Sequence, residues 1–225
     1  MSTPMSRTIR SAPHRAPQPR AWWILLLLSL LIAGYGIGFV WGGEASFRGE
    51  LAASFRARPW GIFSHAMFGS LALLAGPFQL RRDLRVRHPR VHRLLGRAYV
   101  GAALGTGATG LLMALHSSGG PSTHLGFGAL AVLTLATTWT GVARIRAGDV
   151  AAHRAWMLRS VALIFAGVTL RIEQPLLMAA YGGAFAPAYQ LVAWLCWLPN
   201  LAWAEWHLSR SRAVAPVPAP SGAPA

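Results

Sequence analysis

Residues 153–180 read "HRAWMLRSVALIFAGVTLRIEQPLLMAA", a stretch of 28 residues in which apolar side chains predominate. At 1.5 Å per residue, a helix of this length measures about 42 Å, which exceeds the roughly 30 Å of hydrocarbon in a bilayer. The stretch opens with His-Arg, and Arg171 and Glu173 interrupt it near its far end. We interpret it as a transmembrane helix that carries polar groups at two depths.

The rest of the chain repeats this pattern. Hydrophobic residues make up 54% of the 225 residues and charged residues only 12%, which is typical of an integral membrane protein. We predict an all-α, polytopic membrane helix bundle within residues 21–210, flanked by a basic tail (1–20) and an Ala/Pro-rich tail (211–225) that are disordered. Its six transmembrane helices are expected at residues 22–41, 60–80, 92–115, 124–145, 153–180 and 187–208.

Positive charge is unevenly distributed along the chain. The formal net charge is +15, and all 21 basic residues are Arg. With a cytoplasmic N-terminus, all of them lie in cytoplasmic tails, loops or adjoining helix starts except Arg48, Arg56, Arg58 and Arg171, which matches the positive-inside rule. The loop "RRDLRVRHPRV" (81–91) is the strongest cue. We predict that both termini are cytoplasmic and that anionic lipid headgroups, not nucleic acid, are the partners of this charge.

Three motifs follow one another in the sequence: "SHAMFGSLALLAGPFQL" (64–80), "HRLLGRAYV" (92–100) and "AGDVAAHRAWMLRSVALIFAGVTLRI" (147–172). Over residues 60–175 the chain resembles a family of uncharacterised bacterial membrane proteins called domain of unknown function 2306. The resemblance implies a multi-helix domain in the bacterial cytoplasmic membrane, and it implies no activity. The recurrent polar positions of the family match His65, Gln79, His92, Arg93, Arg97, His153, Arg154, Arg159 and Arg171.

An outer polar layer is expected near the extracytoplasmic side. His65 comes five residues after Trp60, about 8 Å below the outer boundary, and Arg171 comes 18 residues after His153, about 27 Å above the inner one. Charged side chains inside a span are costly unless they face the bundle interior and are paired or hydrated. We therefore predict one buried cluster, made of His65, Arg171, Glu173 and Gln174.

An inner polar layer is expected at the cytoplasmic side, where His92 and His153 each begin a span. One interpretation is that His and Arg at these helix ends extend to the interface and bind lipid phosphate. The other is that His92 and His153 ligate the iron of haem b, and that Arg93, Arg97, Arg154 and Arg159 neutralise its propionates. A second haem on the same helix is not expected, because His116 comes 24 residues after His92, about 36 Å along the axis.

Three classes of function remain open. A haem-b or quinone-linked electron-transfer protein uses the inner layer and exchanges electrons with a quinone or a redox partner. A transporter or proton-conducting protein uses His65, Arg171 and Glu173, but its class often has helices broken near the midplane, whereas the prolines here lie toward span ends. A structural or assembly protein needs neither layer. Cys196 is expected to be a packed side chain, and no role is assigned to His116, His124 or His207.

Reporter fusions that end near residues 50, 86, 119, 148 and 184 test this topology. We expect a phosphatase that is active only outside the cytoplasm to give signals that alternate along this series, beginning with an active fusion at residue 50. Each successive helix reverses the direction of the chain, so the sign must change at every step. An inactive fusion at residue 119 contradicts the six-helix assignment.

Overall fold

The computed structural model describes residues 20–47 and 49–213, in which every regular element is a helix. The long helices are α1 (Arg20–Trp41), α3 (Pro59–Gln79), α5 (Pro89–Ala114), α6 (Pro121–Arg146), α7 (Val150–Ile164), α8 (Ala166–Ala180), α9 (Phe185–Leu195) and α10 (Leu198–Ala213). The short ones are η1 (Gly43–Ser46), η2 (Gly49–Leu51), α2 (Ala52–Ala57) and α4 (Arg82–Arg87). The predicted all-α helix bundle is therefore confirmed at the level of its secondary structure.

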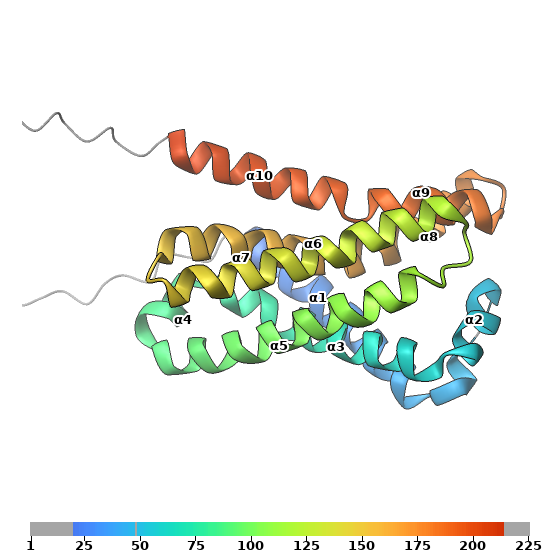
Figure 1. Ribbon diagram of the computed structural model, residues 1–225, viewed down its shortest axis with the longest axis horizontal. Helices are drawn as coiled ribbons and strands as arrows, with labels where there is room; N and C mark the ends of the chain where they lie inside the picture. Colours follow the sequence, from blue (N-terminus) through green and yellow to red (C-terminus); the bar gives the residue numbers. More distant parts are fainter. Residues whose placement is uncertain (1–19, 48, 214–225) are drawn as a thin grey trace, which may run out of the picture.

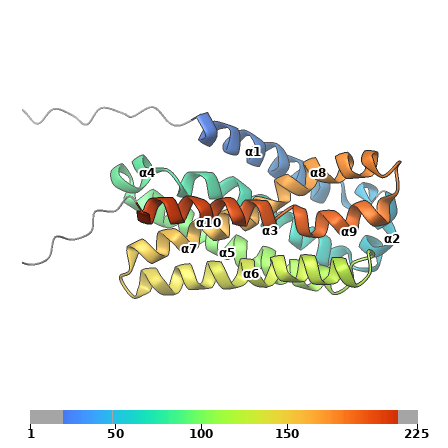
Figure 2. The same ribbon diagram turned by 90° about the horizontal axis from the view of Figure 1, so that it is seen from above.

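The chain crosses the bundle in alternating directions, in the helices α1, α3, α5 and α6 and then in the pairs α7–α8 and α9–α10, each of which makes one pass (Figures 1 and 2). The beginning of α1, the short helix α4, the turn between α6 and α7 and the far end of α10 lie at one end. The connections that contain α2, residues 115–120 and residues 181–184 lie at the other. Four helical segments are long and apolar enough to cross a membrane: Arg20–Trp41, Pro59–Gln79, Pro121–Arg146 and Val150–Ala180. The Gly-rich α5 and the separate, shorter helices α9 and α10 are not among them.

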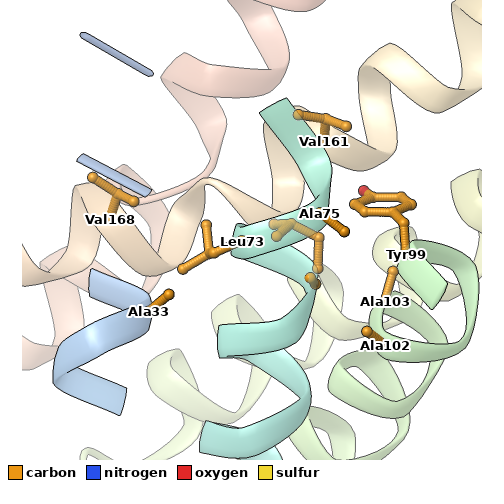
Figure 3. Packing of buried hydrophobic residues seen from close by; sticks show 10 residues of the cluster. Ala33, Leu73, Ala75, Tyr99, Ala102, Ala103, Val161 and Val168 are labelled. Atoms are coloured by element: carbon orange, nitrogen blue, oxygen red, sulfur yellow. The ribbon is translucent and has the colours of Figure 1, made fainter. Parts of the chain in front are cut away.

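Small side chains bring the helices close together in the core. The first buried cluster joins α1, α3, α5, α7 and α8 through residues that include Ala33, Leu73, Tyr99, Val161 and Val168 (Figure 3). Alanines fill much of the rest: Ala72, Ala75, Ala102 and Ala103. Because lipid is as apolar as these side chains, burial gives little drive for association, and close backbone contact supplies the stabilising van der Waals energy instead.

Three hydroxyl groups form a junction between α5, α6 and α7. Tyr99 Oη lies 2.8 Å from Ser160 Oγ, and Thr138 Oγ1 lies 2.7 Å from the same atom. All three side chains are fully buried. A buried hydroxyl without a partner is unfavourable, so this arrangement fixes the three helices in one register.

The last two predicted spans are interrupted. Phe165 separates α7 from α8, where the amides of Val168 and Thr169 both bond to its carbonyl at 2.9 and 3.1 Å. Between α9 and α10 the helix breaks at Cys196 and Trp197, because Pro199 lacks an N–H and its ring crowds the preceding turn. Our expectation that prolines would leave the middle of these spans intact was therefore wrong for the last span.

At the second interruption, side chains donate hydrogen bonds to backbone carbonyl groups that the broken helix leaves without a partner. Trp197 Nε1 donates to the Ala193 carbonyl at 2.9 Å, and Asn200 Nδ2 donates to the Cys196 carbonyl at 3.0 Å. Asn200 also donates to Thr169 Oγ1 of α8 at 2.9 Å. Cys196 is fully buried in a second cluster that includes Leu163, Ala166, Val192 and Trp197, where the two interruptions face each other.

The predicted tails lie largely outside the described residues. Arg20, which we placed in the N-terminal tail, is the first residue of α1, and residues 211–213, which we placed in the C-terminal tail, belong to α10. Residues 1–19, Arg48 and residues 214–225 are outside the part of the chain that the structure describes.

Two glycines of α6 provide a matched test of helix packing. A Cβ on Gly126 would lie 2.8 Å from the carbonyl oxygen of Ala193 in α9, whereas a Cβ on Gly128 would have no neighbour within 4 Å. We expect Gly126→Ala to destabilise the folded protein by about 1–3 kcal/mol, because backbone cannot yield as a flexible side chain can. Gly128→Ala should be neutral or stabilising by up to about 1 kcal/mol. Thermal unfolding in detergent measures both, and equal melting temperatures contradict the close α6–α9 contact.

Candidate functional site in the inner polar layer

His153 is held in a defined orientation at the start of α7. Its Nδ1 lies 2.8 Å from the carbonyl oxygen of Gly141 in α6. A carbonyl only accepts hydrogen bonds, so Nδ1 carries the proton and Nε2 of the neutral ring keeps its lone pair. Glycine at 141 permits this approach, because a Cβ there would lie 2.7 Å from Met157 Sδ, one turn further along α7.

His92 lies in the same region, at the start of α5. The charges that act on it come from Arg85 of α4, Arg93 of α5 and Arg154 of α7, and it also interacts electrostatically with His153. The two histidines that the sequence placed at similar depth are therefore close enough to interact electrostatically. Nδ1 of His92 is buried and has no hydrogen-bond partner. A buried ring nitrogen in this state is unfavourable and is suited to receive a ligand.

The sequence analysis missed two contributors to this layer. Arg85 Nη1 donates to the carbonyl of Gln79 at 3.2 Å, which brings the guanidinium of α4 to the end of α3. Gln79 itself packs against α5, where a Cβ on Gly96 would lie 3.1 Å from its Oε1. Its Nε2 is buried without a partner. The family resemblance named Gln79 as a recurrent polar position but indicated no contact for it. Arg85 was treated only as one of the arginines of the loop 81–91.

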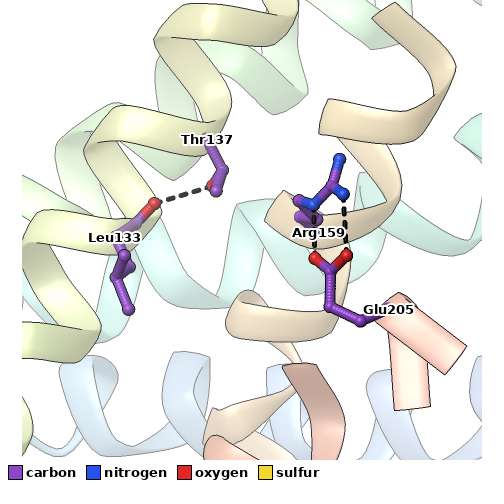
Figure 4. A network of polar contacts seen from close by, with 4 residues as sticks. All are labelled: Leu133, Thr137, Arg159 and Glu205. Atoms are coloured by element: carbon purple, nitrogen blue, oxygen red, sulfur yellow. Dashed lines mark hydrogen bonds and ion pairs between the residues drawn. The ribbon is translucent and has the colours of Figure 1, made fainter. Parts of the chain in front are cut away.

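Arg159 does not join the arginines that act on His92. Its guanidinium makes a two-point ion pair with Glu205 of α10, with distances of 2.5 Å from Nε to Oε1 and 2.8 Å from Nη2 to Oε2 (Figure 4). The same group lies 4.6 Å from the centre of the Trp156 ring. Arg97 is exposed and is not among the charges that act on His92. Of the four arginines predicted around the histidines, the structure therefore brings Arg93 and Arg154 to the site.

The same helical faces continue into the bundle core. Tyr99 lies seven residues after His92, and Ser160 lies seven residues after His153, so each pair shares one face of its helix. Both members of the deeper pair belong to the hydroxyl junction. The histidines of the inner layer thus lie on helical faces whose deeper residues, Tyr99 and Ser160, are fully buried.

The outer polar layer is only partly assembled. Nδ1 of His65 lies 3.4 Å from Thr109 Oγ1 of α5, and a Cβ on Gly110 would lie 3.1 Å from its Cε1. The charge of Arg171 acts on His65. Arg171 lies 5.5 Å from the centre of the Tyr35 ring of α1, and it also interacts with Tyr189 and Cys196.

Glu173 does not neutralise Arg171. The two residues are two positions apart on α8, and side chains at that spacing point to different sides of a helix. Oε2 of Glu173 is buried without a partner, and no carboxylate in the described part of the chain pairs with Arg171. Gln174 is half-buried beside Glu173. Arg171 is itself exposed, so the four residues do not form the single buried cluster that we predicted. The charge of Arg171 acts on His65, and the charges of both Arg171 and Glu173 act on Cys196.

Three further histidines, His116, His124 and His207, were given no role in the sequence analysis. Nδ1–H of His116 donates to the Leu112 carbonyl at 2.9 Å, and the ring of His207 stacks on Trp203 with centroids 5.4 Å apart. His124 is half-buried near the start of α6. Within residues 20–47 and 49–213, no group of three or more His, Cys, Asp or Glu side chains is arranged to hold a metal ion.

Comparison with known proteins gives one result. The model of the predicted membrane protein family DUF2306 matches residues 62–208. The chain belongs to this family. The DUF2306 match begins in α3 and extends through α10, so it contains both polar layers and the two interrupted spans, well beyond residue 175 where the resemblance in the sequence ended. No curated protein and no solved structure matches the chain.

The Arg159–Glu205 pair predicts a measurable coupling between α7 and α10. The side chain of Arg159 is 14% exposed and that of Glu205 is 50% exposed, so solvent weakens the pair. We expect a coupling free energy of about 1 kcal/mol from a double-mutant cycle of Arg159→Gln and Glu205→Gln, measured by thermal unfolding. The cycle of Arg154→Gln with Glu205→Gln is the matched control and should be additive. A coupling below the error of the control cycle contradicts the pair.

Proposed function

We propose that this DUF2306 protein crosses the bacterial cytoplasmic membrane six times, with both termini in the cytoplasm. The alternation of the long helices between two ends supports six passes, because the arrangement needs α5 and the α9–α10 pair to run alongside the four most apolar segments. The arginines of α4 and of the last turn of α6 support the orientation, since these elements lie at the end of the bundle where the described chain starts and stops. Anionic headgroups of the cytoplasmic leaflet are their proposed partners.

We further propose that the protein is an electron-transfer protein that holds haem b at the inner layer, between His92 and His153. The supporting observation is the hydrogen bonding of the ring nitrogens in the two imidazoles. His153 has its Nδ1–H fixed by the Gly141 carbonyl, which is the usual support of a metal-ligating histidine, and His92 has a buried nitrogen without a partner. Haem is chosen over a compact metal site because two histidines suffice as its axial ligands.

The surrounding residues fit an anionic cofactor. Arg93 and Arg154 bring positive charge to His92, as carboxylate propionates require, whereas Arg159 is paired with Glu205. When bound, the haem supplies one-electron chemistry. The chain holds and orients it, and the packed hydroxyl junction of Tyr99, Ser160 and Thr138 excludes water on the outer side. A membrane quinone or a redox protein is the proposed electron partner.

Absorption spectroscopy tests the haem proposal. We expect protein purified from cells with ample haem to show a Soret band and a reduced-minus-oxidised spectrum of six-coordinate b-type haem. His92→Ala and His153→Ala should each abolish or shift these bands, because each removes one axial ligand. His116→Ala and His207→Ala are the matched controls and should leave the spectrum unchanged. A colourless preparation, or a spectrum indifferent to His92 and His153, overturns the assignment.

The second candidate function is transport or proton conduction through the outer layer. The observation that favours it is the contact between two interrupted spans beside a charged residue. The interruptions at Phe165 and at Cys196–Trp197 pack together, and Arg171 interacts with Cys196 without a carboxylate partner in the described segments. Interrupted helices around an intramembrane charge are common at transport sites.

A vesicle assay tests the second candidate. Proteoliposomes with an imposed pH gradient and an internal pH-sensitive dye should dissipate the gradient faster than empty vesicles, and Arg171→Gln should remove that excess rate. Arg56→Gln, at the same end of the bundle but in the connecting helix α2, is the charge-matched control. Equal rates for vesicles with and without protein contradict proton conduction.

A further inference from the structure

An open groove runs along the outside of the bundle between α3 and α5. It has a volume of about 440 Å³ and is lined by Leu71, Leu74, Ala75, Phe78, Leu95 and Ala98. The residues from α3 follow the spacing of one helical face, and all six lining side chains are apolar. Leu71 and Ala98 are exposed, so the groove opens sideways, toward the lipid in a membrane. Its volume falls within the roughly 300–1,000 Å³ of small-molecule sites.

The groove exists because a large side chain next to it turns inward. Tyr99 points into the core, where its hydroxyl bonds to Ser160, and it packs against Gly76 of α3. Its neighbour Ala98 faces outward and is too small to fill the space between α3 and α5. The hydroxyl junction of the core therefore leaves the outer side of this helix pair hollow.

Positive charge is fixed at one end of the groove. Phe78, the last lining residue of α3, precedes Gln79, whose carbonyl accepts a hydrogen bond from Arg85 Nη1 at 3.2 Å. Burial lowers the pKa of Arg85, and the nearby charges of Arg154 and Arg82 lower it further. The cation therefore lies among like charges, and an anion beside it would relieve the repulsion.

An unpartnered polar atom and exposed apolar side chains lie at the same end. Nε2 of Gln79 is buried without a hydrogen-bond partner. Val86 of α4 and Leu94 of α5 are 70% and 68% exposed, although both are apolar. Arginines interleaved with exposed apolar side chains are typical of a segment that lies at the boundary between headgroups and acyl chains.

We propose that the groove between α3 and α5 binds one anionic phospholipid of the cytoplasmic leaflet, with an acyl chain along the groove and its phosphate on Arg85 and the Gln79 amide. The apolar lining accounts for the chain, and the fixed guanidinium accounts for the charge of the headgroup. A neutral quinone would make no use of the positive charge, and free phosphate would make no use of the groove. The proposal rests on the proposed orientation of the chain, which puts α4 at the cytoplasmic leaflet, and it does not require haem, although Arg85 also acts on His92. Its readout is bound lipid, which a colourless protein can still retain.

Lipid retention measured by native mass spectrometry tests the proposal. Purified protein is exchanged into detergent that contains equal amounts of phosphatidylglycerol and phosphatidylcholine, and the bound lipid is counted. We expect one phosphatidylglycerol per chain. Arg85→Gln should weaken retention about tenfold through loss of a charge-assisted hydrogen bond, and Ala98→Phe should weaken it by filling the groove. Arg85→Lys should retain part of the binding, because it keeps the charge.

Two matched variants separate the site from general effects. Arg56→Gln removes one charge at the opposite end of the bundle, and Ala202→Phe enlarges an exposed alanine of α10. Both should retain lipid as the unchanged protein does. Retention that is indifferent to both Arg85→Gln and Ala98→Phe overturns the proposal. Equal retention of phosphatidylcholine, displacement of the lipid by excess inorganic phosphate, or preferential binding of added quinone each overturns it as well.

Discussion

The fold depends on how closely helix backbones approach one another in a medium that gives apolar surfaces little reason to associate. Glycine and alanine at the contacts allow α3 to reach α5 and α6 to reach α7 and α9, and polar bonds then fix the register. The hydroxyl junction of Tyr99, Ser160 and Thr138 is the central case, because it ties three helices at one buried point. The junction also sets the relative positions of α5 and α7 at the inner layer, since His92 lies two turns from Tyr99 and His153 lies two turns from Ser160.

Most of the helices were predictable because a hydrophobic run of sufficient length has few alternatives in a membrane. The first turns of three of these helices were not predicted from the sequence. α3, α5 and α6 begin at Pro59, Pro89 and Pro121, one to three residues before the predicted runs, because proline is favoured in the first turn while its polar neighbours lower the local hydropathy. The break after α9 could have been inferred from Pro199. The interruption at Phe165, between α7 and α8, depends on tertiary packing, and no nearby proline in the sequence indicates it.

In the candidate sites, too, some features could be predicted from the sequence and others could not. The electrostatic interaction between His92 and His153 was expected from their similar depth, which the sequence contains. Arg171 and Glu173 could have been separated in advance, because residues two apart on a helix diverge. The partner of Arg159 lies 46 residues further along the chain, and nothing local connects the two. The position of Arg85 depends in the same way on a tertiary contact, the carbonyl at the end of α3.

The contact between Gly126 and Ala193 also constrains the order in which the chain assembles. α6 is synthesised and paired with α7 well before α9 exists, since the turn that joins α6 to α7 is short and that between α6 and α9 includes two helices. During that interval the face of α6 around Gly126 has no protein neighbour. This face of α6 is covered only after α9 has been synthesised and has packed against it. A nascent chain that ends before α9 therefore leaves this contact surface of α6 uncovered, as in other incompletely assembled folding intermediates.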